Sequence, residues 1–375
     1  MSWETLSRSP QFELRRSGRF LVAELLEPHH VLSTSACNGG QTTGVRFLLN
    51  HQSCEGSGHL ERFQLIVGSG NEAYHVRACA DAGVPPEATA MMGTAANMNY
   101  AAVVREADGD MAVTVVVTAG VESNATCAGD PATWREGAAG MARVPEPAGT
   151  INTMLLIGVP VTPPVLARAV VMMTEGKSAA LQRLAVPSRQ SSDLATGTGT
   201  DQYCVAAPAE GTFVRTSASS HVKLGELIGL AARNATLEAL RWQNGLESSY
   251  TRGVVHALGR YGFTEASLMT DMRALLSERD FELLQKNSKA ALYEPLVGAA
   301  AHALAAVLDR IRHGSLPASV ERDACVQQAA LLAANLAAQP DRWLEFRVRL
   351  LEPAADGPRA LILAALALGW SEKWR

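Results

Sequence analysis

The sequence predicts an α+β domain, a mixed sheet with helices, followed by an all-α domain. Between residues 19 and 215, short apolar runs alternate with glycine-rich turns and helical stretches, a pattern typical of mixed sheets. Beyond Tyr250, alanine and leucine dominate and the strand-like alternation disappears. A chain of 375 residues is long for a single core. We therefore expect two domains, 1–248 and 249–375.

The elements of the first domain follow from apolar runs and helix boundaries. Strands are expected at residues 20–23, 113–117 and 154–157, where apolar residues lie between turns. Pro163 and Pro164 predict the start of a helix over 165–184, which ends before Pro187. A second helix is expected over 224–243, with Gly245 as its C-cap.

The second domain is expected to consist of helices separated by glycine and proline. Helical spacing covers residues 264–286, 290–312, 319–338 and 342–351. Gly314, Pro317, Pro340 and Pro353 separate or follow these segments. No repeat period is strong enough to predict a solenoid.

Composition limits the partners. A net charge of −4 provides no basic field for a nucleic-acid backbone, so no nucleic acid is expected. The N-terminus lacks the pattern of a signal peptide, and the apolar stretch 360–370 is too short to span a bilayer. We expect a cytoplasmic protein with no membrane contact. The six cysteines form no CxxC pair, so we expect free thiols and no metal site. A homo-oligomer is left open.

Polar clusters define a candidate site, and the most informative one is residues 196–201, Thr-Gly-Thr-Gly-Thr-Asp. Its glycines allow close approach of a ligand, and its threonines favour an extended chain with the hydroxyls on one side. Residues 149–153 have the same character and lead into a strand, so both segments are expected to line one pocket. The candidate substrate-binding residues are Ser33, Asn38, Gly39, Gly40, Thr118, Gly120, Asn124, Thr150, Asn152, Thr153, Gly197, Thr198, Gly199 and Thr200.

Each of these clusters also has a simpler interpretation. Asn-Gly-Gly at residues 38–40 is an ordinary hairpin turn in most proteins, and Thr118 to Gly120 also fits a tight turn. The glycine-threonine run lacks the Gly-Lys-Ser/Thr ending of a phosphate loop and the order of a dinucleotide fingerprint. Nucleotide binding is therefore a weak interpretation.

Four residues are candidates for catalysis. Asp201 and His221 are the best acid-base pair, because a histidine oriented by a carboxylate can shuttle protons near neutral pH. Glu175 and Lys177 are two residues apart and do not share a helix face, so we expect a frayed turn at Gly176. A solvated surface pair and a structural histidine are the alternatives.

Taken in order, these clusters resemble the adenosylcobinamide amidohydrolase family of corrinoid salvage, over about residues 18–245. The family commonly has Glu-Ala-Lys where this chain has Glu175-Gly176-Lys177, and Cys37 is not part of its pattern. Nothing after about Tyr250 resembles the family. The resemblance is carried by residues 32–40, Thr118-Ala119-Gly120 with Asn124-Ala125 and Gly129, residues 149–152, Thr174-Glu175-Gly176-Lys177, residues 195–201 and residues 221–229.

The resemblance implies hydrolysis of the amide that joins the aminopropanol arm to the corrin ring, with the corrinoid as substrate and no required cofactor. His221 with Asp201 would act as base and then acid, and Glu175 is the competing base. Lys177, Asn152 and the backbone amides of residues 197–199 would face the oxyanion.

Three further questions stay open at this stage. The nucleophile is water or a hydroxyl of Ser33, Thr150, Thr153 or Thr198. A looser similarity to self-processing amidohydrolases would make Thr153 the nucleophile after cleavage before it. The alternative functions are an inactive corrinoid-binding or regulatory protein and a hydrolase of another amide. The helical domain is either a packing or dimer surface or a lid.

Overall fold

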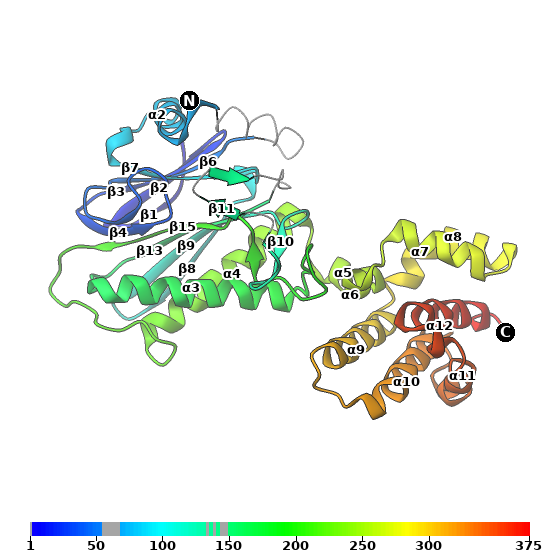
Figure 1. The fold of residues 1–375 in the computed structure, drawn as a ribbon. Coiled ribbons are helices and arrows are strands. Elements are labelled where there is room, and N and C mark those ends of the chain that lie inside the picture. Colours follow the sequence, from blue (N-terminus) through cyan, green and yellow to red (C-terminus); the bar gives the residue numbers. More distant parts are fainter. Residues whose placement is uncertain (1, 55–67, 133–134, 138–139, 143–148) are drawn as a thin grey trace. The chain divides into compact units, whose positions relative to one another are not determined.

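A computed structural model of the chain describes residues 2–54, 68–132, 135–137, 140–142 and 149–375 (Figure 1). It divides into two compact units, Met1–Leu246 and Glu247–Arg375. The first contains mixed sheets with helices and the second is helical, which confirms the predicted fold class. The predicted domain boundary follows residue 248.

The first unit contains a six-stranded sheet with the strand order β5-β4-β15-β13-β9-β8. Strands β13 and β15 are parallel, and the other neighbours are antiparallel. The expected strands 113–117 and 154–157 lie within β9 and β13. The strand bounds are β4 His29–Ser33, β5 Gly40–Thr42, β8 Ala102–Asp108, β9 Met111–Ala119, β13 Ile151–Ile157 and β15 Gln202–Pro208.

A second sheet has the order β1-β2-β3-β6-β7, and only β6 and β7 are parallel. The expected strand 20–23 lies within β3. The bounds are β1 Glu4–Arg8, β2 Phe12–Ser17, β3 Phe20–Leu25, β6 Phe47–Gln52 and β7 Thr89–Thr94. Two small pairs complete the strands: β10 Ala125–Thr126 with β14 Gly197–Thr198, and β11 Arg135–Gly137 with β12 Gly140–Ala142.

The two sheets and the helices form four layers (Figure 1). Met154 and other residues of the six-stranded sheet pack against Leu21 and its neighbours in the five-stranded sheet. The outer face of the six-stranded sheet packs against α3, Pro163–Arg183, and α4, Lys223–Asn244. The outer face of the five-stranded sheet packs against α2, Asn71–Ala82. Burial on both faces explains why β9 and β13 are nearly continuous apolar runs.

The helix predictions for this unit agree closely with the structure. Helix α3 begins at Pro163, and α4 ends at Gly245, which adopts a φ of 63° as the expected C-cap. The 3-10 helices η2 Pro86–Ala88 and η3 Met98–Tyr100 flank β7. Proline therefore predicted the start of α3 correctly, and glycine predicted the end of α4.

The second unit has its own core. Its helices differ from the prediction in number and in bounds, since the expected break at residues 287–289 lies inside a helix that continues to Leu292. The expected single helix 264–286 is two helices, because Ser277 caps the second one by accepting from the N–H of Asp280 at 3.1 Å. The helices Ser248–Thr251, Val254–Leu258 and Pro358–Glu372 were not predicted. The helices are α5 Ser248–Thr251, α6 Val254–Leu258, α7 Glu265–Leu275, α8 Glu278–Leu292, α9 Pro295–Arg312, α10 Ala318–Leu336, α11 Trp343–Arg349 and α12 Pro358–Glu372, with 3-10 turns η4 Gly259–Tyr261, η5 Pro340–Arg342 and η6 Pro353–Asp356.

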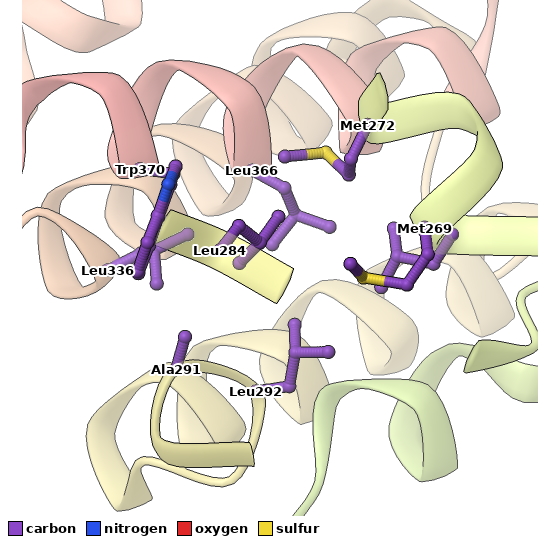
Figure 2. A pocket seen from close by; sticks show the side chains of 9 residues that line it. Met269, Met272, Leu284, Ala291, Leu292, Leu336, Leu366 and Trp370 are labelled. Atoms are coloured by element: carbon purple, nitrogen blue, oxygen red, sulfur yellow. The ribbon is translucent and has the colours of Figure 1, made fainter. Parts of the chain in front are cut away.

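A pocket in this unit is lined by apolar side chains, among them Leu268, Met272 and Trp370 (Figure 2). It presents no acidic or basic side chain for chemistry. Within the described ranges, no single helix is both long and apolar enough to cross a bilayer. Helices α8 and α9 meet that test only together, with a bend of 78° between them.

Candidate active site

Three polar clusters meet at one end of the six-stranded sheet. Strands β13 and β15 are parallel and both begin there, while the antiparallel β9 ends there. Residues 118–120, 149–152 and 197–201 are therefore neighbours. The hydroxyl of Thr150 donates to the carbonyl of Thr200 at 2.7 Å, and the N–H of Gly120 donates to the carbonyl of Thr150 at 3.0 Å. Segments 149–153 and 196–201 therefore lie side by side, and their lining of one substrate pocket stays a prediction.

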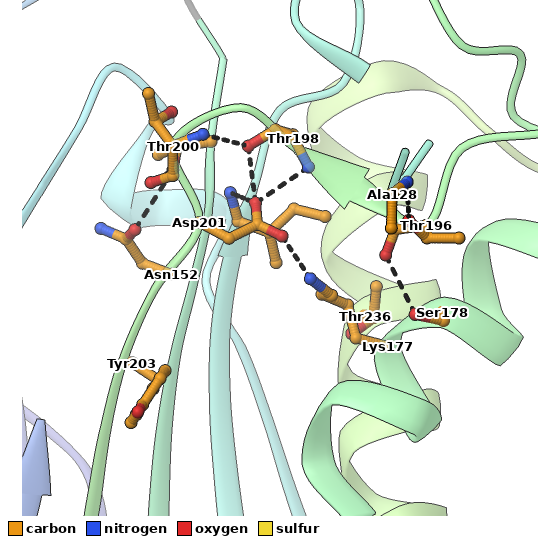
Figure 3. A network of polar contacts seen from close by, with 12 residues as sticks. Ala128, Asn152, Lys177, Ser178, Thr196, Thr198, Thr200, Asp201, Tyr203 and Thr236 are labelled. Carbon is orange, nitrogen blue, oxygen red and sulfur yellow. Dashed lines mark hydrogen bonds and ion pairs between the residues drawn. The ribbon is translucent and has the colours of Figure 1, made fainter. Parts of the chain in front are cut away.

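Asp201 is the centre of this site (Figure 3). One carboxylate oxygen, Oδ1, accepts from the Thr198 hydroxyl at 2.5 Å and from the N–H groups of Thr198 and Ile151 at 3.1 Å each. The other oxygen, Oδ2, contacts the ammonium of Lys177 from α3. The side chains of Lys177 and Asp201 are 14% and 20% exposed, so the pair is partly buried and still reaches solvent.

Gly197 makes room for this ion pair. A Cβ at this position would lie 2.4 Å from Asp201 Oδ2 and 2.8 Å from Lys177 Nζ. Only glycine fits there without displacing the charged groups. Gly199 is similarly close to Asn124, since a Cβ would lie 3.2 Å from its Oδ1.

The run 196–201 is not the extended chain with hydroxyls on one side that the sequence predicted. Its residues 197–198 form the short strand β14, and a turn follows at Gly199 and Thr200. The Thr196 hydroxyl accepts from the N–H of Ala128, and the Thr200 hydroxyl donates to the carbonyl of Gly149 at 2.9 Å. Three threonines therefore serve three different partners, because the turn redirects the chain after Thr198.

Helix α3 positions Lys177 and holds the neighbouring loop. It is continuous through Gly176, so the frayed turn expected there is absent. Glu175 and Lys177 point to different sides: Lys177 reaches Asp201, whereas Glu175 is exposed. The hydroxyl of Ser178, the next residue, donates to the carbonyl of Thr196 at 3.0 Å.

The amides of Asn124 and Asn152 are used within the protein. Asn152 Nδ2 donates to Asn50 Oδ1 at 2.9 Å and to the carbonyl of Gly93 at 3.1 Å. Asn124 Nδ2 donates to the carbonyl of Gly149 at 2.8 Å and to the Thr200 hydroxyl at 3.3 Å. Both donor hydrogens of each amide are occupied, so in this structure Asn152 offers no donor to an oxyanion.

Thr118 and Thr153 are also buried in the fold. The Thr118 hydroxyl accepts from Asn50 Nδ2 at 2.8 Å. Thr153 lies in the middle of β13, is 4% exposed and pairs with β9 on one side and β15 on the other. Its strand neighbours Ile151 and Leu155 belong to the core shared with α3 and α4, so alternation places Thr153 on that face.

The cluster at residues 33–40 holds the free edge of β7. The Ser35 hydroxyl accepts from the N–H of Met91 at 2.8 Å, and Asn38 Nδ2 donates to the carbonyl of Thr89 at 2.8 Å. The edge strand therefore has partners for its backbone groups. Gly39 is required by close packing, because a Cβ there would lie 1.9 Å from the carbonyl oxygen of Ser35.

The fold also explains Gly40 and Ser33, two other members of this cluster. Gly40 has a φ of 77°, a conformation that favours glycine. Ser33 is buried and faces Cys204 across the β4–β15 pair. Burial raises the pKa of the Cys204 thiol to about 12. Burial, aided by the charge of Glu72, also raises the pKa of Cys37, which leaves its thiol a poorer nucleophile.

His221 does not lie near Asp201 in the structure. It lies two residues before α4, whose first residue, Lys223, interacts electrostatically with Asp108 at the β8–β9 turn. The last residue of α4, Asn244, accepts from the N–H of Val121, just beyond the other end of β9. A helix of 22 residues is about 33 Å long, so His221 and Asp201 are at opposite ends of the sheet. The predicted acid-base pair is wrong, because α4 spans the distance between them.

Sequence analysis missed two polar residues that complete the site. Asn50 joins Asn152 to Thr118, and Gln202 Oε1 accepts from the N–H of Gly93 at 2.8 Å. Asn50 interrupts the apolar run of β6, and Gln202 directly follows Asp201. A polar residue inside a buried strand was the available signal for Asn50. Across the described segments, no three His, Cys, Asp or Glu side chains are grouped to hold a metal ion.

Comparison with known proteins identifies the family. Residues 4–248 match the family of adenosylcobinamide amidohydrolases. The chain belongs to this family. Its helical unit lies beyond the match, as the resemblance in the sequence predicted.

Two individual proteins are similar to this member of the family. The uncharacterized protein MJ1613 of Methanocaldococcus jannaschii is 34% identical over 167 residues, which are 42% of this chain and 65% of that protein. The chain therefore spans just under two thirds of this relative's length. The crystal structure of the PH0078 protein from Pyrococcus horikoshii aligns with a TM-score of 0.30 and 12% identity, over 64% of this chain and 82% of that one.

The departure from the family's Glu-Ala-Lys motif has a structural reason here. Gly176 faces α4, and a Cβ would lie 2.6 Å from the carbonyl oxygen of Gly229. Helices α3 and α4 approach too closely for alanine at this point. Glycine at position 176 thus matches the closeness of the two helices beside Lys177.

Proposed function

We propose that this protein hydrolyses the amide bond between the corrin ring and the aminopropanol arm of adenosylcobinamide, giving adenosylcobyric acid for cobamide salvage. The observation that carries the proposal is the Lys177–Asp201–Thr198 site, which is built from the family's own motifs. Family membership supports an amidohydrolase with a corrinoid substrate. The site supports amide cleavage because it places a carboxylate, an ammonium and a hydroxyl together.

In the proposed reaction, Asp201 acts as the general base and Lys177 as the general acid. Asp201 takes a proton from a water molecule, and the water oxygen forms a bond to the amide carbon. The carbon–nitrogen bond then breaks, and the leaving amine receives a proton from Lys177. The contact between Lys177 and Asp201 returns the proton to the lysine, so the site ends as it began.

Thr198 serves Asp201 in this scheme. Its hydroxyl and N–H both bond to Asp201 Oδ1, which fixes the direction of the carboxylate. Among the N–H groups of residues 197–199, that of Gly197 is the proposed oxyanion donor. The N–H of Thr198 is occupied by Asp201, and the N–H of Gly199 donates to the carbonyl of Asn124 at 3.4 Å. Glu175 and His221 have no part in the reaction.

Turnover of adenosylcobinamide by variant proteins tests the proposal. Asp201→Asn and Lys177→Met should each lower kcat at least about a hundredfold, since each removes one proton-transferring group. Glu175→Gln should leave kcat within about twofold, because an exposed carboxylate contributes no proton in this scheme. Adenosylcobyric acid is quantified by mass spectrometry, and thermal unfolding verifies that each variant is folded.

Three results would contradict the proposal in different ways. Tight binding without product would indicate a corrinoid-binding or regulatory protein. Faster turnover of a simple amide would indicate another amide substrate. An acyl adduct on Thr198 would replace water as the nucleophile.

The self-processing alternative is tested on the same preparation by intact mass. We expect one chain of 39.8 kDa, because Thr153 is buried in the interior of β13. Cleavage before Thr153 would instead give two chains and make its hydroxyl the nucleophile.

A further inference from the structure

Asp130 connects β10, a strand of the small β10–β14 pair, to the segment that follows α3. The proposed reaction does not use this carboxylate. Its Oδ2 accepts from the N–H of Cys127 at 2.7 Å and from the hydroxyl of Thr126 at 3.0 Å. The same oxygen accepts from the hydroxyl of Ser188 at 2.6 Å. One carboxylate therefore joins the end of β10 to the segment that follows α3.

The strand pair beside Asp130 is too short to be stable alone. Ala125 pairs with Thr198 and Thr126 pairs with Gly197, so each strand contributes two residues. Isolated two-stranded pairs are marginal in water even when longer. The pair therefore depends on contacts from outside it.

These outside contacts include Ser188. Its hydroxyl donates to Asp130 and accepts from the N–H of Gln190 at 3.0 Å. The N–H of the next residue, Arg189, donates to the carbonyl of Ala125 at 2.9 Å. The segment after α3 thus binds the edge of β10 that β14 leaves free.

The pair in turn determines where Thr198 and Asp201 lie. The N–H of Thr196 donates to the carbonyl of Thr126 at 3.0 Å, and Thr198 holds Asp201 Oδ1 at 2.5 Å. A chain of direct contacts therefore runs from Asp130 through β10 and β14 to the candidate catalytic carboxylate.

We propose that Asp130 is a positioning residue, which orders the β10–β14 pair and thereby fixes Thr198 and Asp201 for the reaction. Its effect on turnover depends on the proposed function, whereas its effect on the order of the pair does not. Displacement of a catalytic group by about 1 Å can cost up to a hundredfold in rate. Loss of Asp130 should therefore lower kcat more than it changes KM.

Amide hydrogen exchange and kinetics of four variants test this role. Asp130→Ala should speed exchange in peptides covering residues 125–130 and 196–198 about tenfold, and lower kcat at least about tenfold. Ser188→Ala should act in the same direction. Asp130→Asn should recover part of both losses, because its amide oxygen still accepts hydrogen bonds.

Glu122→Ala is the matched control. Glu122 is an exposed carboxylate in the β9–β10 connection, on the other side of β10 in the sequence from Asp130. Its replacement by alanine removes the same charge but none of the contacts of Asp130. We expect wild-type exchange and kcat in this variant. Unchanged exchange at residues 196–198 in both Asp130→Ala and Ser188→Ala would overturn the proposal, as would equal effects of Glu122→Ala. If the wild type does not turn over adenosylcobinamide while Asp130→Ala still loosens the pair, the proposed function fails and the positioning role stands.

Discussion

Lys177 and Asp201 come from elements far apart in the sequence, and their contact depends on a third residue. Lys177 projects from the C-terminal half of α3, while Asp201 lies just before β15. Gly197 lies against both charged groups, where a side chain would collide with them. Removal of either charge would leave the other partly buried without its partner, which is costlier than losing an exposed pair.

The position of His221 leads to a prediction opposite to that from the sequence. His221→Ala should keep kcat within about twofold of wild type, because its imidazole is a helix length away from the reacting groups. Steady-state turnover of adenosylcobinamide provides the measurement. A hundredfold loss in a folded variant would return His221 to the reaction and contradict the placement of α4.

Asp130 predicts a change in local order with pH. Burial alone would raise the pKa of its carboxyl, but hydrogen bonds from Ser188, Ser191, Thr126 and the Cys127 N–H lower it below 3.8. A depressed pKa in the folded state stabilises the fold above the unfolded value, and this contribution is lost as the pH falls through the folded pKa.

We therefore expect the β10–β14 pair to stay ordered down to about pH 4 and to loosen below the folded pKa of Asp130. A carboxyl-carbon NMR titration measures that pKa directly. The Asp130→Asn variant should show no such acid-dependent step in its exchange. A titration of Asp130 above pH 3.8 would contradict the expected sign.

The residues that meet in the candidate site could be predicted better than their contacts. The motifs located Asp201, Thr198 and Lys177, because glycine, threonine and charge stand out between apolar strands. Their partners could not be predicted, because contacts between segments 24 to 50 residues apart depend on the layers. Asn38 was predicted to bind the substrate, yet its side-chain amide donates to the carbonyl of Thr89 in β7. No local sequence pattern indicates that β7 is an edge strand.

At the scale of elements, α3, which carries Lys177, packs closely against α4. Gly176 lies where α3 meets α4 and faces the carbonyl of Gly229. Sequence spacing predicted both helices and their ends from proline and glycine. It misinterpreted Gly176 as a break, because a glycine inside a helix looks the same whether it frays the helix or admits a neighbour.

Paired glycine variants distinguish these two interpretations. Gly176→Ala should lower the free energy of unfolding by about 1–2 kcal/mol, since the overpacking cost exceeds the gain in helix propensity. Gly229→Ala gains the same propensity, and its Cβ would lie 3.5 Å from Met172 Cε and 3.9 Å from the Met172 carbonyl oxygen, which are ordinary contacts. This variant should therefore be neutral or stabilising by up to about 1 kcal/mol. Urea unfolding compares the two. A stabilised Gly176→Ala variant would show that the helices are not in close contact.

The whole chain is organised as two units with separate cores. The three apolar clusters of the first unit contain residues up to Leu246, and the cluster of the second contains residues from Val254 to Trp370. No described cluster includes residues from both units. The change in composition near Tyr250 predicted this division, because it marks the point where strand periodicity ends. The family match ends at residue 248, close to the same point.

Separate cores predict that residues 1–248 fold without the helical unit. All the described contacts of Lys177, Thr198 and Asp201 come from the first unit, so this shortened chain should keep kcat and KM within about twofold of the full chain. Calorimetry of the full chain should show two unfolding transitions, of which the shortened chain keeps one. A raised KM with the remaining transition intact would instead support the helical unit as a lid over the corrinoid. The control is the full chain purified and assayed in parallel, because its KM defines the comparison.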